Sequence, residues 1–136
     1  MEDLGRRTLE GAAKTIEQSP FSYPQLLIAV DFALGPTKEV VIAGDPATPQ
    51  TAELVRMLQS RFLPRVVAVL HPVGSGREAI EALVPDVSAQ GPLHGMPTAY
   101  VCENAICKLP TTDPATFVEL LDQSTEQSNL LKRPVP

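Results

Sequence analysis

Two cysteines, Cys102 and Cys107, are the residues of this chain whose type and spacing most directly suggest chemistry, and the chain has no others. They stand on either side of Glu103-Asn104-Ala105, in two short apolar stretches typical of the strands of a β-hairpin. If Asn104-Ala105 forms a two-residue turn, Cys102 faces Cys107 as a non-hydrogen-bonded pair with Cα atoms about 4.5 Å apart, at the short end of disulfide geometry. Alanine is unfavourable at a turn position with positive φ, so a longer loop is the alternative.

In this register the two cysteines share one apolar face of the hairpin with Tyr100 and Leu109. Free cysteine is among the most buried residue types, so we expect two reduced cysteines packed in the core. A disulfide or redox-sensitive pair is the alternative, which a cytosolic location disfavours. A metal site would need further ligands, and the two histidines, His71 and His94, stand in separate loops at no spacing typical of zinc. We expect no metal and no cofactor.

Three further residues are candidates for binding a small ligand. Asp45 follows the first predicted strand, His71 ends the second, and α/β proteins bind ligands at the carboxyl ends of such strands. Arg77 follows a Gly-rich turn into a helix, where backbone N–H groups can hold an anion, although the pattern matches neither the P-loop nor the dinucleotide fingerprint. The alternatives are structural: Asp45 bonds to its own turn, His71 is solvated or loosely hydrogen-bonded, and Arg77 belongs to a flexible loop.

A helical hairpin followed by an α/β layer is predicted to position these residues. Apolar residues at helix spacing predict helices over 4–18 and 22–34, which together form an αα-hairpin over residues 1–36. From residue 37 we expect strands at 39–44, 66–70, 98–102 and 106–109, with helices at 48–64, 75–84 and 112–121. This βαβαββα order predicts a mixed four-stranded sheet with helices on its faces, because βαβ units are parallel and hairpins antiparallel. Residues 123–136 are polar and are predicted to form a flexible tail.

Composition excludes several classes of function. The 136 residues carry a net charge of −5 without a basic stripe, which disfavours nucleic-acid binding. No run approaches the roughly 18 apolar residues of a membrane helix. The N-terminus lacks the apolar segment of a signal peptide, so we expect a cytoplasmic protein that does not bind membranes.

One resemblance is topological. The segment Gly95-Met96-Pro97-Thr98, the hairpin after it and the closing helix, all preceded by a βαβ unit, resemble the C-terminal half of a thioredoxin domain. The resemblance implies that Pro97 is a structural marker in the cis form. Thioredoxins carry Cys-X-X-Cys at the start of the helix after the first strand, where this chain reads Gly44-Asp45-Pro46-Ala47-Thr48. The predicted fold class is therefore α/β, thioredoxin-like, without the redox motif of that fold.

A second resemblance is to a family, and it covers roughly residues 20–122. The blocks that carry it are Tyr23-Pro24-Gln25-Leu26-Leu27, Lys38 to Asp45, Thr98 to Asn104 with Cys107, and Thr112-Asp113-Pro114. They resemble the C-terminal end of the spermatogenesis-associated, thioredoxin-domain-containing proteins and their bacterial YyaL-type relatives. Long members of that family are similar to a thioredoxin-like domain joined to an (α/α)6 toroid of the kind seen in sugar epimerases and six-hairpin glycosidases.

The family resemblance implies that this chain is a fragment of such a parent protein. Residues 4–34 would be the last helical hairpin of the toroid, and residues 37–122 a C-terminal α/β domain. We expect a non-catalytic accessory domain that packs on the rest of a parent linked to carbohydrate metabolism. The alternatives are a thiol-redox module that uses Cys102 and Cys107, and a small-ligand domain that uses Asp45, His71 and Arg77.

Overall fold

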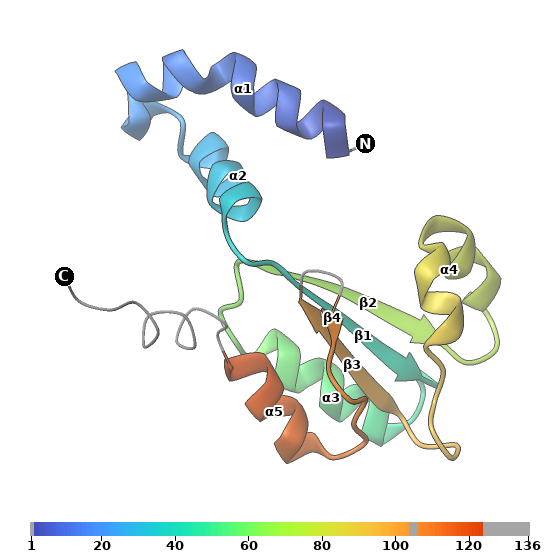
Figure 1. Cartoon of the computed structure of the whole chain (residues 1–136). Coiled ribbons are helices and arrows are strands. Elements are labelled where there is room, and N and C mark those ends of the chain that lie inside the picture. Colours follow the sequence, from blue (N-terminus) through green and yellow to red (C-terminus); the bar gives the residue numbers. More distant parts are fainter. Residues whose placement is uncertain (1, 104–105, 124–136) are drawn as a thin grey trace. The chain divides into compact units, whose positions relative to one another are not determined.

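The computed structural model describes residues 2–103 and 106–123, which form two compact units divided between Thr37 and Lys38. The elements in chain order are α1 (Glu2–Gln18), η1 (Pro20–Ser22), α2 (Pro24–Leu34), β1 (Lys38–Gly44), α3 (Pro49–Gln59), β2 (Val66–Pro72), α4 (Arg77–Leu83), η2 (Pro85–Ala89), β3 (Thr98–Glu103), β4 (Ile106–Cys107) and α5 (Pro114–Asp122) (Figure 1).

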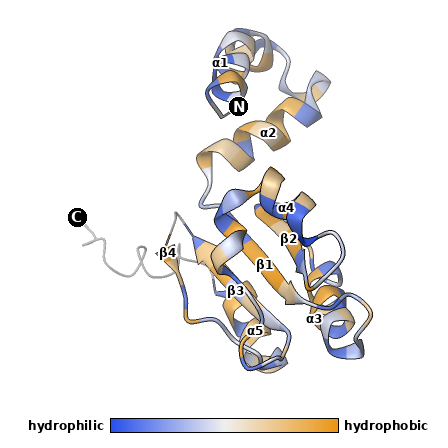
Figure 2. Ribbon diagram, turned by 90° about the vertical axis from the view of Figure 1, so that its right-hand side faces the viewer, coloured by the Kyte–Doolittle hydropathy of each residue, from blue (hydrophilic) through white to orange (hydrophobic). Residues whose placement is uncertain are grey.

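The first unit consists of α1 and α2, joined through the short 3-10 helix η1. Pro24 occupies the first position of α2, where its missing N–H would be unpaired in any case. Ile16 is the one apolar side chain among the described residues of this unit that is buried. The predominantly hydrophobic colouring of α2 in Figure 2 therefore marks side chains in contact with solvent. The exposed large apolar residues of this unit are Leu4, Phe21, Tyr23, Leu27, Ile28, Phe32 and Leu34.

The second unit is built on a four-stranded mixed sheet with the strand order β2-β1-β3-β4. Strands β1 and β2 are parallel, whereas β3 is antiparallel to both β1 and β4. Val40 of β1 lies beside Ala68 of β2 and Val101 of β3, which sets the register of the three longer strands. The predicted α/β class and the mixed four-stranded sheet are confirmed.

One face of this sheet forms the hydrophobic core. Side chains alternate between the two faces of a strand, so Val40 and Ile42 of β1 share a face with Ala99 and Val101 of β3. Helices α3 and α5 cover this face (Figure 1). The buried residues of the core cluster are Val40, Ile42, Leu54, Ala99, Val101, Phe117 and Leu121.

Each of the two covering helices begins at an N-cap. The Thr48 hydroxyl caps α3 by accepting a hydrogen bond from the Thr51 N–H. The Asp113 carboxylate accepts from the Thr116 N–H at 2.8 Å and from the Thr116 hydroxyl at 2.6 Å. Each cap is followed by proline at the first helical position.

Lys38, the first residue of β1, holds the C-terminal end of α5. Its ammonium donates to the carbonyl oxygens of Leu120 at 3.0 Å and Leu121 at 2.9 Å, and also to that of Gln123. Leu120 and Leu121 belong to the last turn of the helix and Gln123 is its C-cap, where carbonyl groups have no intrahelical partner. Partial burial lowers the pKa of Lys38 through desolvation, and the nearby carboxylates of Glu103 and Asp122 oppose that shift.

The carboxyl end of β1 is closed by a tight contact, which leads to a stability prediction. A Cβ at Gly44 would lie 2.5 Å from the Thr51 hydroxyl oxygen and 3.1 Å from the Pro97 Cβ. We expect Gly44→Ala to lower the free energy of unfolding by about 1–3 kcal/mol, because overpacking must displace a fully buried residue. Gly91→Ala is the control, since a Cβ there meets nothing within 4 Å. Urea denaturation would measure both, and equal stabilities would contradict the prediction.

Pro97 is trans, because no peptide bond among the described residues is cis, so the expected cis form is wrong. The chain reverses earlier, at His94 and Gly95, with φ of 52° and 75°. Positive φ at both central residues is typical of a type I′ turn. The Met96 N–H donates to the Leu93 carbonyl at 2.9 Å and closes this turn. Because the reversal is complete before Pro97, no cis bond is needed to start β3.

Candidate functional site

Cys102 and Cys107 lie directly opposite each other in β3 and β4, with Cα atoms 3.8 Å apart, and they form a disulfide bond. The Lys108 N–H donates to the Val101 carbonyl at 2.9 Å, so the neighbouring pair is hydrogen-bonded and the cysteine pair is not. The predicted register is therefore confirmed. The predicted turn residues 104–105 lie outside the described residues.

The expectation of two reduced cysteines packed in the core is wrong. Cys102 is buried, but Cys107 is exposed and bonded to it. The reason is that β4 is a two-residue strand at the end of the sheet. Beyond Lys108 the chain carries one extra residue before Thr111 pairs with Ala99, and in this bulge Leu109 is 87 % exposed instead of sharing the cysteine face.

The disulfide lies on the sheet face opposite α3 and α5. Across the strands it continues a row in which Cys102 is beside Glu39, and Glu39 is beside Val67. Glu39 is exposed and Val67 is 47 % exposed, so this end of the face is largely open. The other end of the same face holds His71.

His71 is buried, with 2 % of its side chain exposed, and both ring nitrogens have partners. Nδ1 lies 2.7 Å from the Gln90 carbonyl oxygen, and Nε2 lies 3.0 Å from Oε1 of Glu81. The expectation of a solvated or loosely bonded histidine is therefore wrong. The chain after β2 folds back as α4 and η2 and covers this end of the sheet, which excludes water from the ring.

Arg77 joins the same cluster by donating to Oε1 of Glu81 at 2.7 Å. A carbonyl only accepts, so His71 Nδ1 carries a hydrogen and donates it to the Gln90 carbonyl. The Arg77 N–H is the main reason that the pKa of Glu81 is lowered. The cluster thus ties β2, α4 and the loop after η2 together.

Sequence reasoning missed two members of this cluster, Glu81 and Gln90. The i,i+4 spacing of Arg77 and Glu81 was the available signal for the first, since such pairs face each other on a helix. Gln90 takes part through its backbone carbonyl, which a pattern of side-chain types in the sequence does not predict.

Asp45 is not part of this cluster. Its carboxylate accepts the Ala47 N–H at 2.9 Å, and its carbonyl accepts the Thr48 N–H at 3.0 Å. Asp45 thus bonds to its own turn, while His71 and Arg77 are joined through Glu81. Because these polar groups satisfy one another, we do not propose a ligand site here.

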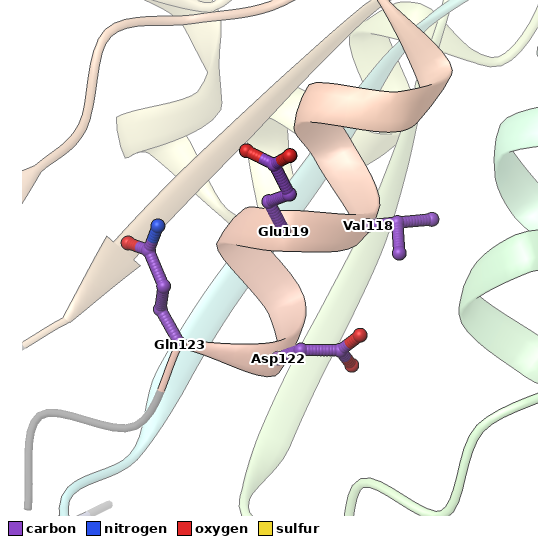
Figure 3. Close-up of a pocket in the computed structure, with 4 residues that line it drawn as sticks. All are labelled: Val118, Glu119, Asp122 and Gln123. Atoms are coloured by element: carbon purple, nitrogen blue, oxygen red, sulfur yellow. The ribbon is translucent and has the colours of Figure 1, made fainter. Parts of the chain in front are cut away.

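Metal binding and a depression beside α5 are the two remaining candidates for a ligand site, and neither is supported by the side chains present. Within residues 2–103 and 106–123, no three His, Cys, Asp or Glu side chains gather as metal ligands would. A shallow depression beside α5 is lined by Val118, Glu119, Asp122 and Gln123 (Figure 3). All four come from one helix end, and Asp122 is paired with Arg61 at 3.2 Å. None of the described helices has the length and apolar character needed to span a bilayer.

The carboxylates of Glu81 and Asp113 predict how stability changes with pH. Hydrogen bonds from Arg77 lower the pKa of Glu81, and those from Thr116 lower the pKa of Asp113. A carboxyl whose pKa is lower in the folded state stabilises above its ordinary pKa, and this contribution disappears as pH falls through the folded value. We therefore expect the urea midpoint to fall between pH 5 and pH 3, and to fall less in the Glu81→Gln/Asp113→Asn double variant. An unchanged slope in the double variant would contradict this assignment.

Comparison with known proteins identifies the relatives of this chain. No family model matches it, and no solved structure does. Human spermatogenesis-associated protein 20 is 30 % identical over 113 residues, which are 83 % of this chain and 14 % of the human protein. The rat and mouse proteins of the same name are 27 % and 26 % identical over 115 residues, 85 % of this chain. Most of this chain is therefore homologous to one region of spermatogenesis-associated protein 20, and it spans about 14 % of the length of the relatives it matches.

Proposed function

We propose that this chain is a non-catalytic accessory and interaction region at the C-terminal end of a larger, thioredoxin-domain-containing protein. The observation that carries the proposal is the apolar surface of the first unit, where Phe21 is 97 % exposed, Leu34 82 % and Ile28 57 %. Large apolar side chains gathered on a short segment are typical of surfaces that pack against another part of a protein. In the larger protein, whose activity would be linked to carbohydrate metabolism, residues 1–36 close a helical toroid in the cytoplasm.

The α/β unit, residues 37–122, is proposed to be a thioredoxin-like domain that lacks the redox motif of that fold. The strand order β2-β1-β3-β4, with β1 and β2 parallel and β3 antiparallel to β1, supports this proposal. The trans form of Pro97 departs from thioredoxins, as does the absence of cysteine from residues 44–48. Both departures fall where a thioredoxin has its active site, which favours a structural role. Residues 123–136 are proposed as a tail, and beyond Gln123 they lie outside the described residues.

Hydrogen exchange on this chain tests the accessory role. We expect weak protection across residues 4–34 and strong protection in β1, whose central residues are buried between two strands. Added helical segments of the larger protein should then raise protection in residues 4–34. Strong protection throughout 4–34 in the chain alone would overturn the proposal.

A second candidate function is a thiol-redox module, and the Cys102–Cys107 disulfide with its exposed Cys107 favours it. Thiol titration should find no free thiol in the oxidised chain and two after mild reduction, with both lost again on reoxidation. Two slowly reacting thiols under both conditions would show instead that the cysteines have a packing role.

A further inference from the structure

We propose that the Cys102–Cys107 disulfide exchanges with a cysteine-bearing peptide that pairs in extended form with the outer edge of β4, and that Cys107 is the sulfur attacked. The inference deepens the redox candidate above and rests on it. It adds a substrate class, an extended cysteine peptide, and a direction for the exchange.

The backbone of Cys107 offers hydrogen-bonding groups at the edge of the sheet. In an antiparallel ladder, the residues of a non-hydrogen-bonded pair direct their N–H and C=O groups away from the partner strand. The cysteine pair is of this kind, because Lys108 bonds to Val101. Among the described residues the sheet ends at β4. The N–H and C=O of Cys107 therefore point outward at the sheet edge, where an extended peptide can add as a further strand.

Backbone hydrogen bonds would fix the register of such a peptide. A peptide residue directly opposite Cys107 would exchange both backbone hydrogen bonds with it, which places the two Cα atoms about 5.5 Å apart. Disulfides span Cα separations of about 4.4–6.8 Å. Directly paired residues also point to the same face of the sheet. A cysteine at that position thus has its sulfur beside the sulfur of Cys107.

The two sulfurs of the disulfide differ in their access to an attacking thiolate. Cys102 is 5 % exposed, whereas Cys107 is exposed on the edge strand. The peptide thiolate attacks Cys107 Sγ and forms a peptide–Cys107 disulfide. The Cys102–Cys107 bond breaks, and its electron pair leaves on Cys102 Sγ, which then takes up a proton. One disulfide is exchanged for another without net oxidation.

A second thiol completes the reaction. This thiol, another cysteine of the peptide's protein or a small thiol, attacks the peptide sulfur of the mixed disulfide. The peptide is then oxidised to a disulfide, and Cys107 leaves as a thiolate. Across both steps the partner loses two electrons and the hairpin gains them.

The test uses the oxidised chain and a peptide Thr-Val-Cys-Val-Thr, with alkylation and mass mapping of the mixed disulfide. The matched control is the same peptide with N-methylcysteine, which lacks the N–H that would donate to the Cys107 carbonyl. We expect the adduct on Cys107, with the unmethylated peptide reacting about tenfold faster, as the loss of an edge hydrogen bond implies. Adduct on Cys102, or equal rates for the two peptides, would overturn the inference.

Two variants provide an independent measurement. Cys102→Ser leaves Cys107 alone, and Cys107→Ser leaves the buried Cys102. With the peptide activated as a thiopyridyl disulfide, we expect Cys102→Ser to react at least about tenfold faster, because access to the sulfur governs such rates. Equal rates would contradict the assignment of Cys107. If dithiothreitol also fails to reduce the disulfide, the redox function itself is contradicted. If dithiothreitol reduces it but the two peptides react at equal rates, only this inference is contradicted.

Discussion

Replacing Phe117 by alanine is expected to lower the free energy of unfolding by about 3–5 kcal/mol. Phe117 is fully buried, and it is the largest side chain at the centre of the core cluster. It connects α5 to the sheet face formed by Val40 and Val101, so its loss leaves a cavity that no single side chain fills. A domain of this size is commonly stable by about 5–15 kcal/mol, so the variant should unfold at markedly lower urea.

Phe62→Ala is the matched control, because it removes the same atoms from a side chain that is 91 % exposed. We expect its stability to stay within about 0.5 kcal/mol of the parent chain. Urea denaturation followed by circular dichroism measures both variants. Similar decreases in the free energy of unfolding for Phe117→Ala and Phe62→Ala would contradict the position of the hydrophobic core in the structure.

Replacing His71 by asparagine is expected to lower the free energy of unfolding by about 1–3 kcal/mol. The shorter side chain does not span the distance between Glu81 and the Gln90 carbonyl, which the imidazole bridges with contacts of 3.0 and 2.7 Å. The Gln90 carbonyl would lose its partner beside the buried ring, whereas Glu81 would keep its bond to Arg77, and an unpaired buried polar group costs more than a hydrogen bond gains. The segment from α4 to η2 should then loosen from the sheet.

His94→Asn is the control for this variant. His94 is exposed at φ 52°, and asparagine tolerates that left-handed conformation, so little change is expected. Hydrogen exchange gives the specific readout: His71→Asn should lose protection in residues 77–90 before it loses protection in β1. Uniform loss across the α/β unit would show that the cluster has no local role.

The bonding of His71 also bears on the proposed function. Thr98, which lies across β1 from it at the same end of the sheet, is fully buried, and the Tyr100 hydroxyl donates to the Gly91 carbonyl at 2.6 Å. This burial raises the pKa of the Tyr100 hydroxyl. The groups at the carboxyl ends of β1 and β2 thus hold loops in place, as an accessory domain requires. At the opposite end of the sheet, the exposed Cys107 is accessible to reactants in solution.

The sequence by itself determined the features of this chain that depend on interactions between neighbouring residues. Apolar periodicity predicted the order of the elements, with helices that start near residues 48 and 112, and the five-residue spacing of Cys102 and Cys107 set their pairing. Each of these depends on residues a few positions apart, where hydrogen bonds and side-chain spacing leave few arrangements. The family resemblance rested on such short blocks and was confirmed.

The tertiary structure decided what depends on distant partners. His71 meets Glu81 and Gln90 because α4 and η2 fold back over β2. The spacing of residues along the sequence does not predict this contact, because burial depends on which other segments of the chain pack over a residue. The same holds for the cysteine pair: its register was local, but its exposure followed from the place of β4 at the end of the sheet. Spacing determined which cysteine faces which, and only the assembled sheet decided that one of them meets solvent.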